Sequence, residues 1–158
     1  MDGSMEEMIS SPAWIEQSRI ILDSFAKCVG RELIARTGDP KSDATALFEA
    51  PFVVASHDTR EDPVLNFGNR TALTLWEAKL EEFLQMPSRL TAEAPLREER
   101  ARMLRQTAEQ GYIDDYKGVR ISLTGKRFLI EKALVWNLTD ASGELAGQAA
   151  TFSNWTPL

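Results

Sequence analysis

The residues with the chemical character of a catalytic group gather around one histidine. His57, the only histidine of the 158-residue chain, is preceded by Ser56 and followed by Asp58. A histidine oriented by a carboxylate can act as a general base, with Ser56 or Ser88 as the nucleophile. Neither serine lies on a glycine-rich elbow, and the chain has no phosphate-cradling loop. We therefore expect no catalytic residue, and keep as the alternative a small α+β enzyme that uses His57 on an apolar substrate.

Metal binding is not indicated by the sequence. A lone histidine at the end of a predicted strand is more often a polar strand end than a ligand, because a metal site needs further donors. Asp114 and Asp115 are neighbours on a predicted strand, so their side chains point to opposite faces. Cys28, the single cysteine, excludes an internal disulfide and a cysteine-rich metal site. On a predicted helix beside Lys27, it is expected to be a buried apolar residue rather than a reactive thiol.

Length, composition and charge limit the class of protein. The chain has room for one domain with a single core, and its 43% apolar and 27% charged residues are typical of a globular protein. A net charge of −6 argues against nucleic-acid binding, and Glu98 and Glu99 interrupt the arginines of residues 96–105, as on a solvated helix face. No apolar run reaches the ~18 residues of a membrane span, and no signal peptide is recognisable, so we expect a cytoplasmic protein.

A long amphipathic helix is predicted over residues 11–37. Serine and proline stand at its start, and Gly38 at its end can adopt the left-handed conformation that terminates a helix. An apolar stripe of this length needs a partner, either the body of the same domain or a second copy of the helix. We expect a homodimer through this helix. Residues 1–10 are expected to be disordered, and residues 1–4 are set aside as a cloning remnant.

The remaining chain predicts short helices between strands. The elements are a helical turn at residues 43–49, strands at 51–57 and 64–67, helices at 69–76, 78–84 and 95–110, a loop at 86–90, and strands at 112–123, 126–138 and 144–152. In the run 126–138 the apolar residues fall on both parities, with Phe128, Ile130, Leu134 and Trp136 on one and Leu129, Ala133 and Val135 on the other. A strand that is apolar on both faces is covered on both sides. We expect an α+β fold with a five-stranded antiparallel sheet, short helices on one face and the N-terminal helix beside it.

The order of these elements resembles a known family. Residues 63–77 pass from a short strand through a corner at Gly68 and Asn69 into an amphipathic helix, as sensor domains of the PAS type do. More closely, the chain resembles the MEKHLA family, a PAS-like group of free-standing bacterial proteins and of C-terminal domains in plant homeodomain–leucine zipper factors. The segments that carry the likeness are residues 47–54, 69–73, 86–90, 111–116, 118–122, 135–138 and 147–152. The string of six letters that names the family is absent. We take residues 11–158 as one domain.

The resemblance implies that cofactors must be considered. A flavin photoadduct needs a thiol on the short helices, and a covalently attached chromophore needs a cysteine, but residues 51–158 contain none. Haem usually takes an axial histidine from the long helix, and residues 95–110 contain none. We therefore expect no covalent cofactor, neither haem nor a flavin photoadduct, and instead a non-covalent small ligand of unknown identity.

The resemblance also implies a ligand pocket between the sheet and the helices of residues 69–110. Arg89 is the most specific candidate for a polar pocket residue, because an arginine in an apolar loop pairs either with an internal carboxylate or with a carboxylate of a ligand. The expected pocket residues are Phe52, Phe67, Asn69, Trp76, Arg89, Tyr112, Tyr116, Arg120 and Trp136. We predict a sensor or interaction module that signals by association, with itself or with a protein partner. A core closed by side chains, acting only through protein contacts, is a further alternative.

Overall fold

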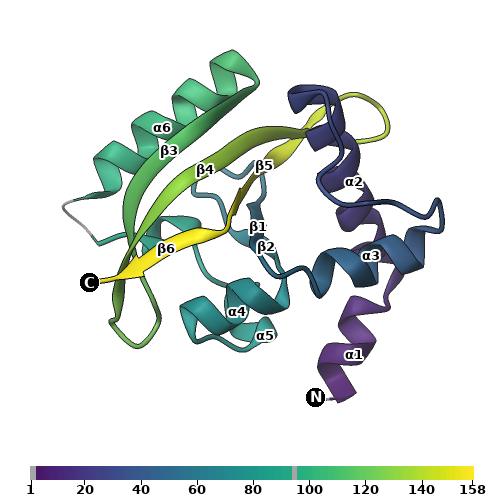
Figure 1. Cartoon of the computed structure of the whole chain (residues 1–158), viewed down its shortest axis with the longest axis horizontal. Coiled ribbons are helices and arrows are strands. Elements are labelled where there is room, and N and C mark those ends of the chain that lie inside the picture. The colour runs from purple at the N-terminus through teal and green to yellow at the C-terminus, as the bar shows by residue number, and fades with distance from the viewer. Residues whose placement is uncertain (1–2, 94–95) are drawn as a thin grey trace.

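The computed structural model describes residues 3–93 and 96–158 (Figure 1). The expectation of a disordered N-terminus falls partly on residues 1–2, which lie outside the described residues. From residue 3 that expectation is wrong, because helix α1 (Gly3–Ile9) precedes the long helix. Met5, Met8 and Ile9 of α1 pack against the edge of the hydrophobic core, and this contact orders the segment.

A six-stranded antiparallel sheet forms the centre of the described chain. Its strands are β1 (Val53–His57), β2 (Leu65–Gly68), β3 (Tyr112–Ile121), β4 (Arg127–Thr139), β5 (Leu145–Phe152) and β6 (Asn154–Pro157). The strand order is β2-β1-β5-β4-β3, and β6 pairs with β4. The expected count of five strands is therefore corrected to six. The reason is the length of β4: β5 pairs only with its second half, and after a bend the chain continues as β6 along its first half.

Helix α2 (Pro12–Val29) is shorter than the sequence predicts. Ser11 caps its start, since the Ser11 hydroxyl accepts a hydrogen bond from the amide of Trp14 at 3.2 Å. The helix ends at Gly30, whose φ of 84° is left-handed, and not at Gly38. A glycine in this conformation stops a helix without the steric cost that other residues have.

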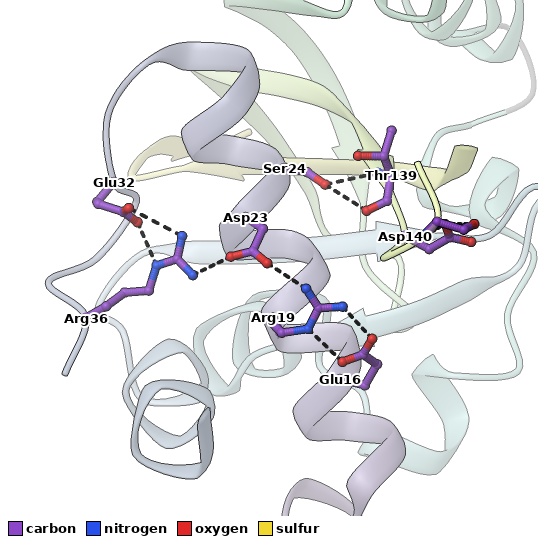
Figure 2. Close-up of polar contacts among 9 residues, drawn as sticks. Glu16, Arg19, Asp23, Ser24, Glu32, Arg36, Thr139 and Asp140 are labelled. Carbon is purple, nitrogen blue, oxygen red and sulfur yellow. Dashed lines mark hydrogen bonds and ion pairs between the residues drawn. The ribbon is translucent and has the colours of Figure 1, made fainter. Parts of the chain in front are cut away.

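Helix α2 buries its apolar stripe within its own chain. Phe25 is fully buried and meets Trp136 of β4 edge to face at 4.9 Å, and Trp14 stacks on Phe67 of β2 at 4.4 Å. The Ser24 hydroxyl accepts a hydrogen bond from the Thr139 amide at 3.0 Å (Figure 2). The sheet thus supplies the partner that the stripe needs.

The opposite side of α2 carries charges. Arg19 pairs with Glu16 and Asp23, and Asp23 also pairs with Arg36, which in turn binds Glu32 (Figure 2). These side chains are a quarter to half exposed, so each pair contributes little to the free energy of unfolding. The charged network makes this side of α2 a solvated surface.

The other helices follow the predicted order with shifted ends. They are α3 (Pro40–Phe48), α4 (Arg70–Trp76), α5 (Leu80–Phe83), the 3₁₀ turn η1 (Ser88–Thr91) in the predicted loop, and α6 (Arg97–Gln110). In Figure 1, α6 runs along β3 and β4 on the side away from α2. The sheet is therefore covered on both faces.

A bulge in β4 changes which side chains face α6. Lys132 has a φ of 55°, and across it Ala133 pairs with Tyr116 while Ile130 pairs with Gly118. The extra residue reverses the alternation, as β-bulges do. Ile130 and Ala133 therefore share the face toward α6, whereas Trp136 lies under α2. The expectation that Phe128, Ile130, Leu134 and Trp136 share one face is wrong for this reason.

None of the helices in the described part of the chain is both long enough and apolar enough to cross a membrane.

Candidate functional site

A cavity of about 80 Å³ lies between the sheet and the helical segments α4, α5, η1 and α6. An apolar cavity of about 150 Å³ can bind benzene, so this space is large enough for several waters or for one small molecule. Its walls are mainly apolar, and they include Leu65, Trp76, Phe83, Met103, Ile130, Ala133, Val135 and Phe152. The polar side chains on its walls include His57, Arg100, Tyr116, Arg120 and Gln148. The core is therefore not closed by side chains.

His57 presents an unpaired nitrogen at this cavity. Its side chain is only 8% exposed at the end of β1, and Nδ1 lies 2.9 Å from the carbonyl oxygen of Asp58. Because a carbonyl only accepts, Nδ1 carries the proton, and a neutral ring leaves Nε2 as an acceptor. Nε2 is buried and has no hydrogen-bond partner among the described residues. Burial lowers the pKa of His57, and the nearby charge of Arg100 lowers it further.

Two arginines meet the cavity from different elements. Arg120 of β3 is 6% exposed and donates to the carbonyl of Val119 at 2.9 Å and to the hydroxyl of Tyr116 at 3.2 Å. Arg100 of α6 is partly buried, and burial together with the charge of Arg120 lowers the pKa of Arg100 to about 10. Neither forms an ion pair with a carboxylate in residues 3–93 and 96–158. The positive charge at this end of the cavity is thus uncompensated by the described side chains.

Gly118 allows the Tyr116 ring to lie against β3. A Cβ at Gly118 would collide with the hydroxyl of Tyr116. The missing side chain therefore places the hydroxyl where it receives the hydrogen bond from Arg120.

Gln148 connects the cavity wall to α6 directly and to α2 through Asn137. Its Nε2 donates to the carbonyl of Leu104 on α6 at 2.9 Å and to Oδ1 of Asn137 at 3.1 Å. Asn137 in turn donates to the carbonyl of Ala108 on α6, and its own carbonyl accepts from Cys28 on α2 at 3.8 Å. A chain of contacts thus links α6, the sheet and α2.

Three of the nine expected pocket residues line the cavity, namely Trp76, Tyr116 and Arg120. The indole Nε1 of Trp76 is buried and has no hydrogen-bond partner among the residues described. The ring meets Phe83, Phe128 and Phe152 edge to face.

The other six expected residues lie elsewhere, which corrects the predicted lining. Phe67 and Trp136 face α2, and Phe52 and Tyr112 are partly buried at the margin of the core. Asn69 is fully buried, caps α4 through the amide of Ala72, and donates to the carbonyls of Leu47 and Phe52. Arg89 is about half exposed and pairs with Asp62 at 3.1 Å, the internal carboxylate being one of its two expected partners.

Sequence reasoning missed Arg100 and Gln148. It places His57 at a strand end, where the structure has it, and in the cavity only in the enzyme alternative. For Arg100 a signal exists, because Arg100, Met103 and Thr107 follow helical spacing on the buried side of α6. A charged residue in such a stripe marks a site that needs a partner. For His57 and Gln148 the sequence holds no such signal, since the face of the sheet on which their side chains lie depends on strand pairing.

The serines named as nucleophiles are not joined to His57. The Ser56 hydroxyl bonds Asn66 and Gln17, on the α2 side of the sheet, and Ser88 is buried outside the cavity lining. The Asp58 carboxylate accepts the amide of Val64 rather than the ring of His57. No hydrogen bond between a serine and His57 occurs in the described chain, so the arrangement lacks an activated nucleophile.

Cys28 lies away from the cavity on α2. Its thiol is partly buried against Asn137, and this burial raises the pKa of the thiol. A thiol with a raised pKa is a poor nucleophile. Among the described residues, no group of three or more His, Cys, Asp or Glu side chains is placed to hold a metal ion.

A family model of the MEKHLA domain matches residues 15–157. The chain belongs to the MEKHLA family. A comparison with curated proteins finds no match. Among solved structures, this MEKHLA domain is similar to the PAS domain of a protein from Colwellia psychrerythraea, with a TM-score of 0.62 and 14% identity over 75% of this chain and 95% of that one.

Light-oxygen-voltage domains are also similar in structure. One, studied with a flavin analogue, has a TM-score of 0.58 and 18% identity, covering 74% of this chain and 84% of that one. The light-state dimer of the fungal blue-light photoreceptor Vivid has a TM-score of 0.55 and 13% identity, covering 83% of this chain and 91% of that one. At these identities the likeness shows a PAS-like sensor fold, and the resemblance drawn from the sequence is confirmed.

Proposed function

We propose that this MEKHLA domain is a sensor or interaction module that binds a small non-covalent ligand in the cavity beside α6. The observation that carries the proposal is the unpaired Nε2 of His57 on the cavity wall. Leaving a buried polar atom without a partner costs about 1–3 kcal/mol, so a bound molecule that pairs it would be stabilised. The apolar walls supply the rest of a small-ligand site.

The proposed signal passes from the cavity to α2. A ligand that displaces α6 acts on the bonds of Leu104 to Gln148 and of Ala108 to Asn137. Asn137 contacts Cys28, so the change reaches the helix on the other face. Output is by association, with a protein partner or with a second copy through α2. Because the apolar stripe of α2 is buried, a homodimer would use the charged side with Arg19 and Asp23.

The cofactor and location belong to the same proposal. We propose no covalent cofactor, no haem and no flavin photoadduct. Cys28 is not among the residues that line the cavity, and about 80 Å³ is small for a multi-ring group. A cytoplasmic location without nucleic-acid binding is supported by the single cysteine and by the net charge of −6.

The test is native mass spectrometry of the full chain purified from its own host. We expect a bound small molecule whose mass disappears in Ala133→Leu, because Ala133 is fully buried on the cavity wall and a larger side chain fills the space. The matched control is Ala141→Leu, the same change at an exposed turn position, and it should keep the bound mass. If Ala133→Leu is folded and binds as the native chain does, the cavity is not the ligand site.

A second candidate is the small α+β enzyme, favoured by the one observation that Nε2 of His57 is free to accept a proton. The discriminating variant is His57→Ala. If this variant retains ligand binding and every measurable function, an enzymatic function that depends on His57 is excluded.

A further inference from the structure

The arginines of this chain differ in how their charge is balanced. Seven form ion pairs with carboxylates within the described residues, namely Arg19, Arg36, Arg60, Arg70, Arg89, Arg105 and Arg127. All seven have side chains between a quarter and three quarters exposed. Arg120 is almost fully buried and Arg100 is partly buried, and neither has such a partner in the described chain. Burial makes an uncompensated charge costly. Arg100 and Arg120 therefore need an anionic partner more than the exposed arginines do.

Arg100 and Arg120 also act on each other. They come from α6 and β3, line the same cavity, and the charge of Arg120 lowers the pKa of Arg100. Two guanidinium groups offer only donors, and a single carboxylate has two oxygens that can accept from both. An anion between them would replace a repulsion by two attractions.

His57 needs a hydrogen-bond donor from the ligand, whereas the two arginines need an acceptor. Its Nδ1 donates to the carbonyl of Asp58, so Nε2 of the neutral ring can only accept. A bare carboxylate has no hydrogen to give to this nitrogen. A hydroxyl on the ligand supplies that hydrogen while the carboxylate binds the arginines.

The size and lining of the cavity limit the rest of the ligand. An apolar cavity of about 150 Å³ can bind benzene, so a space of about 80 Å³ suits a molecule no larger than that, such as an acid with two or three carbons. Phe83, Ile130 and Phe152 offer apolar contacts to a short carbon chain. A dicarboxylate would place its second carboxylate against these apolar walls, and the described lining has no cation besides Arg100 and Arg120.

We propose that the cavity binds a small 2-hydroxycarboxylate, with its carboxylate between Arg100 and Arg120 and its hydroxyl donated to His57. The inference rests on the proposed ligand-binding function and deepens it by naming the ligand class. Neither the MEKHLA match nor the PAS-like neighbours assign a ligand to these residues.

Isothermal titration calorimetry of the full chain, in a buffer low in chloride and phosphate, tests the proposal with glycolate and L- and D-lactate as probes. Propionate lacks the hydroxyl, and lactamide and propane-1,2-diol lack the charge. We expect one lactate enantiomer or glycolate to bind, and lactamide and the diol to bind at least about tenfold more weakly, the loss expected for a charge-assisted hydrogen bond. Propionate should fall between them.

Variants then assign the contacts. Arg100→Gln should weaken the hydroxy acid about tenfold or more, while Arg102→Gln, an exposed arginine two residues along α6, should leave its affinity unchanged. His57→Phe should remove the preference for the hydroxy acid over propionate. Arg100 is chosen because Arg120 is nearly fully buried and bonds Tyr116, so its replacement risks unfolding the domain.

Each other outcome refutes a defined part. If lactamide or the diol binds as tightly as the hydroxy acids, the ligand does not need a carboxylate. If Arg100→Gln binds the hydroxy acid as tightly as the native chain does, Arg100 is not part of the site. If no acid binds while native mass spectrometry shows a neutral molecule in the cavity, this inference fails and the proposed function stands. If neither acids nor any molecule from the host are bound, both fail.

Discussion

Acidification should destabilise this protein through one side chain, because His57 is its only histidine and its pKa is lowered by burial. In the unfolded chain the ring takes up a proton near its ordinary pKa of about 6.5, whereas the folded protein keeps the ring neutral. The stabilisation is therefore complete above about pH 7.5 and is lost as the pH falls below about 6.5. Burial is the main cause, and the charge of Arg100 also opposes protonation, whereas the carbonyl and the carboxylate of Asp58 favour it less strongly than burial opposes it. Gln148, the partner of His57 on β5, carries no charge.

The size of the effect follows from linkage. Each pH unit below the unfolded pKa costs up to about 1.4 kcal/mol of unfolding free energy for one group. Between about pH 7.5 and pH 5.5 the loss is up to about 1.4 kcal/mol, and it stops when the pH reaches the folded pKa. The other groups with shifted pKa values titrate outside this window, since the pKa values of Glu16, Asp39, Asp43 and Asp140 are lowered and that of Cys28 is raised.

Urea unfolding followed by tryptophan fluorescence measures this free energy, because three of the four tryptophans are buried. The control is His57→Asn, whose amide can still donate to the Asp58 carbonyl but does not titrate. The native protein should lose stability on acidification from pH 7.5 to 5.5, and the variant should not. Equal slopes for the two proteins, or a native chain that is more stable at low pH, would refute the assignment of a neutral, buried His57.

The remaining predictions concern the elements that hold the site, and urea unfolding measures both. Phe25→Ala should lower the unfolding free energy by about 3–5 kcal/mol, because Phe25 is fully buried against Trp136, while the exposed Lys27→Ala should change it by less than about 0.5 kcal/mol. A loss below about 1 kcal/mol for Phe25→Ala would mean that α2 is not part of the core. Asn69→Ala should cost at least about 2 kcal/mol, since four backbone groups lose their partner, and Asn69→Asp should cost less because it keeps the two acceptor bonds. Equal losses for the two variants would show that the amide donors, and not the cap, dominate.

The sequence predicts much of the element order, because the signals for it are local. Turn residues and alternating runs mark β3, β4 and β5, which form within two residues of their predicted ends, whereas β6 is not predicted. Errors arise where two local signals compete. The helix pattern continues past Gly30, and the glycine ends the helix there because it can adopt a left-handed conformation. The sequence analysis places Asn69 in the pocket, although an asparagine directly before a helix is also a typical N-cap.

The candidate site was less predictable because it depends on distant contacts. The sequence by itself determined the antiparallel hairpins, the apolar stripe of α2 and the absence of a second cysteine or histidine, since these follow from residue type and spacing. Only the tertiary structure decided that the bulge at Lys132 turns Ile130 toward α6 and leaves Trp136 under α2. It also decided that two arginines twenty residues apart share one cavity. Strand register and helix packing set these positions, and neither is encoded in a single run of residues.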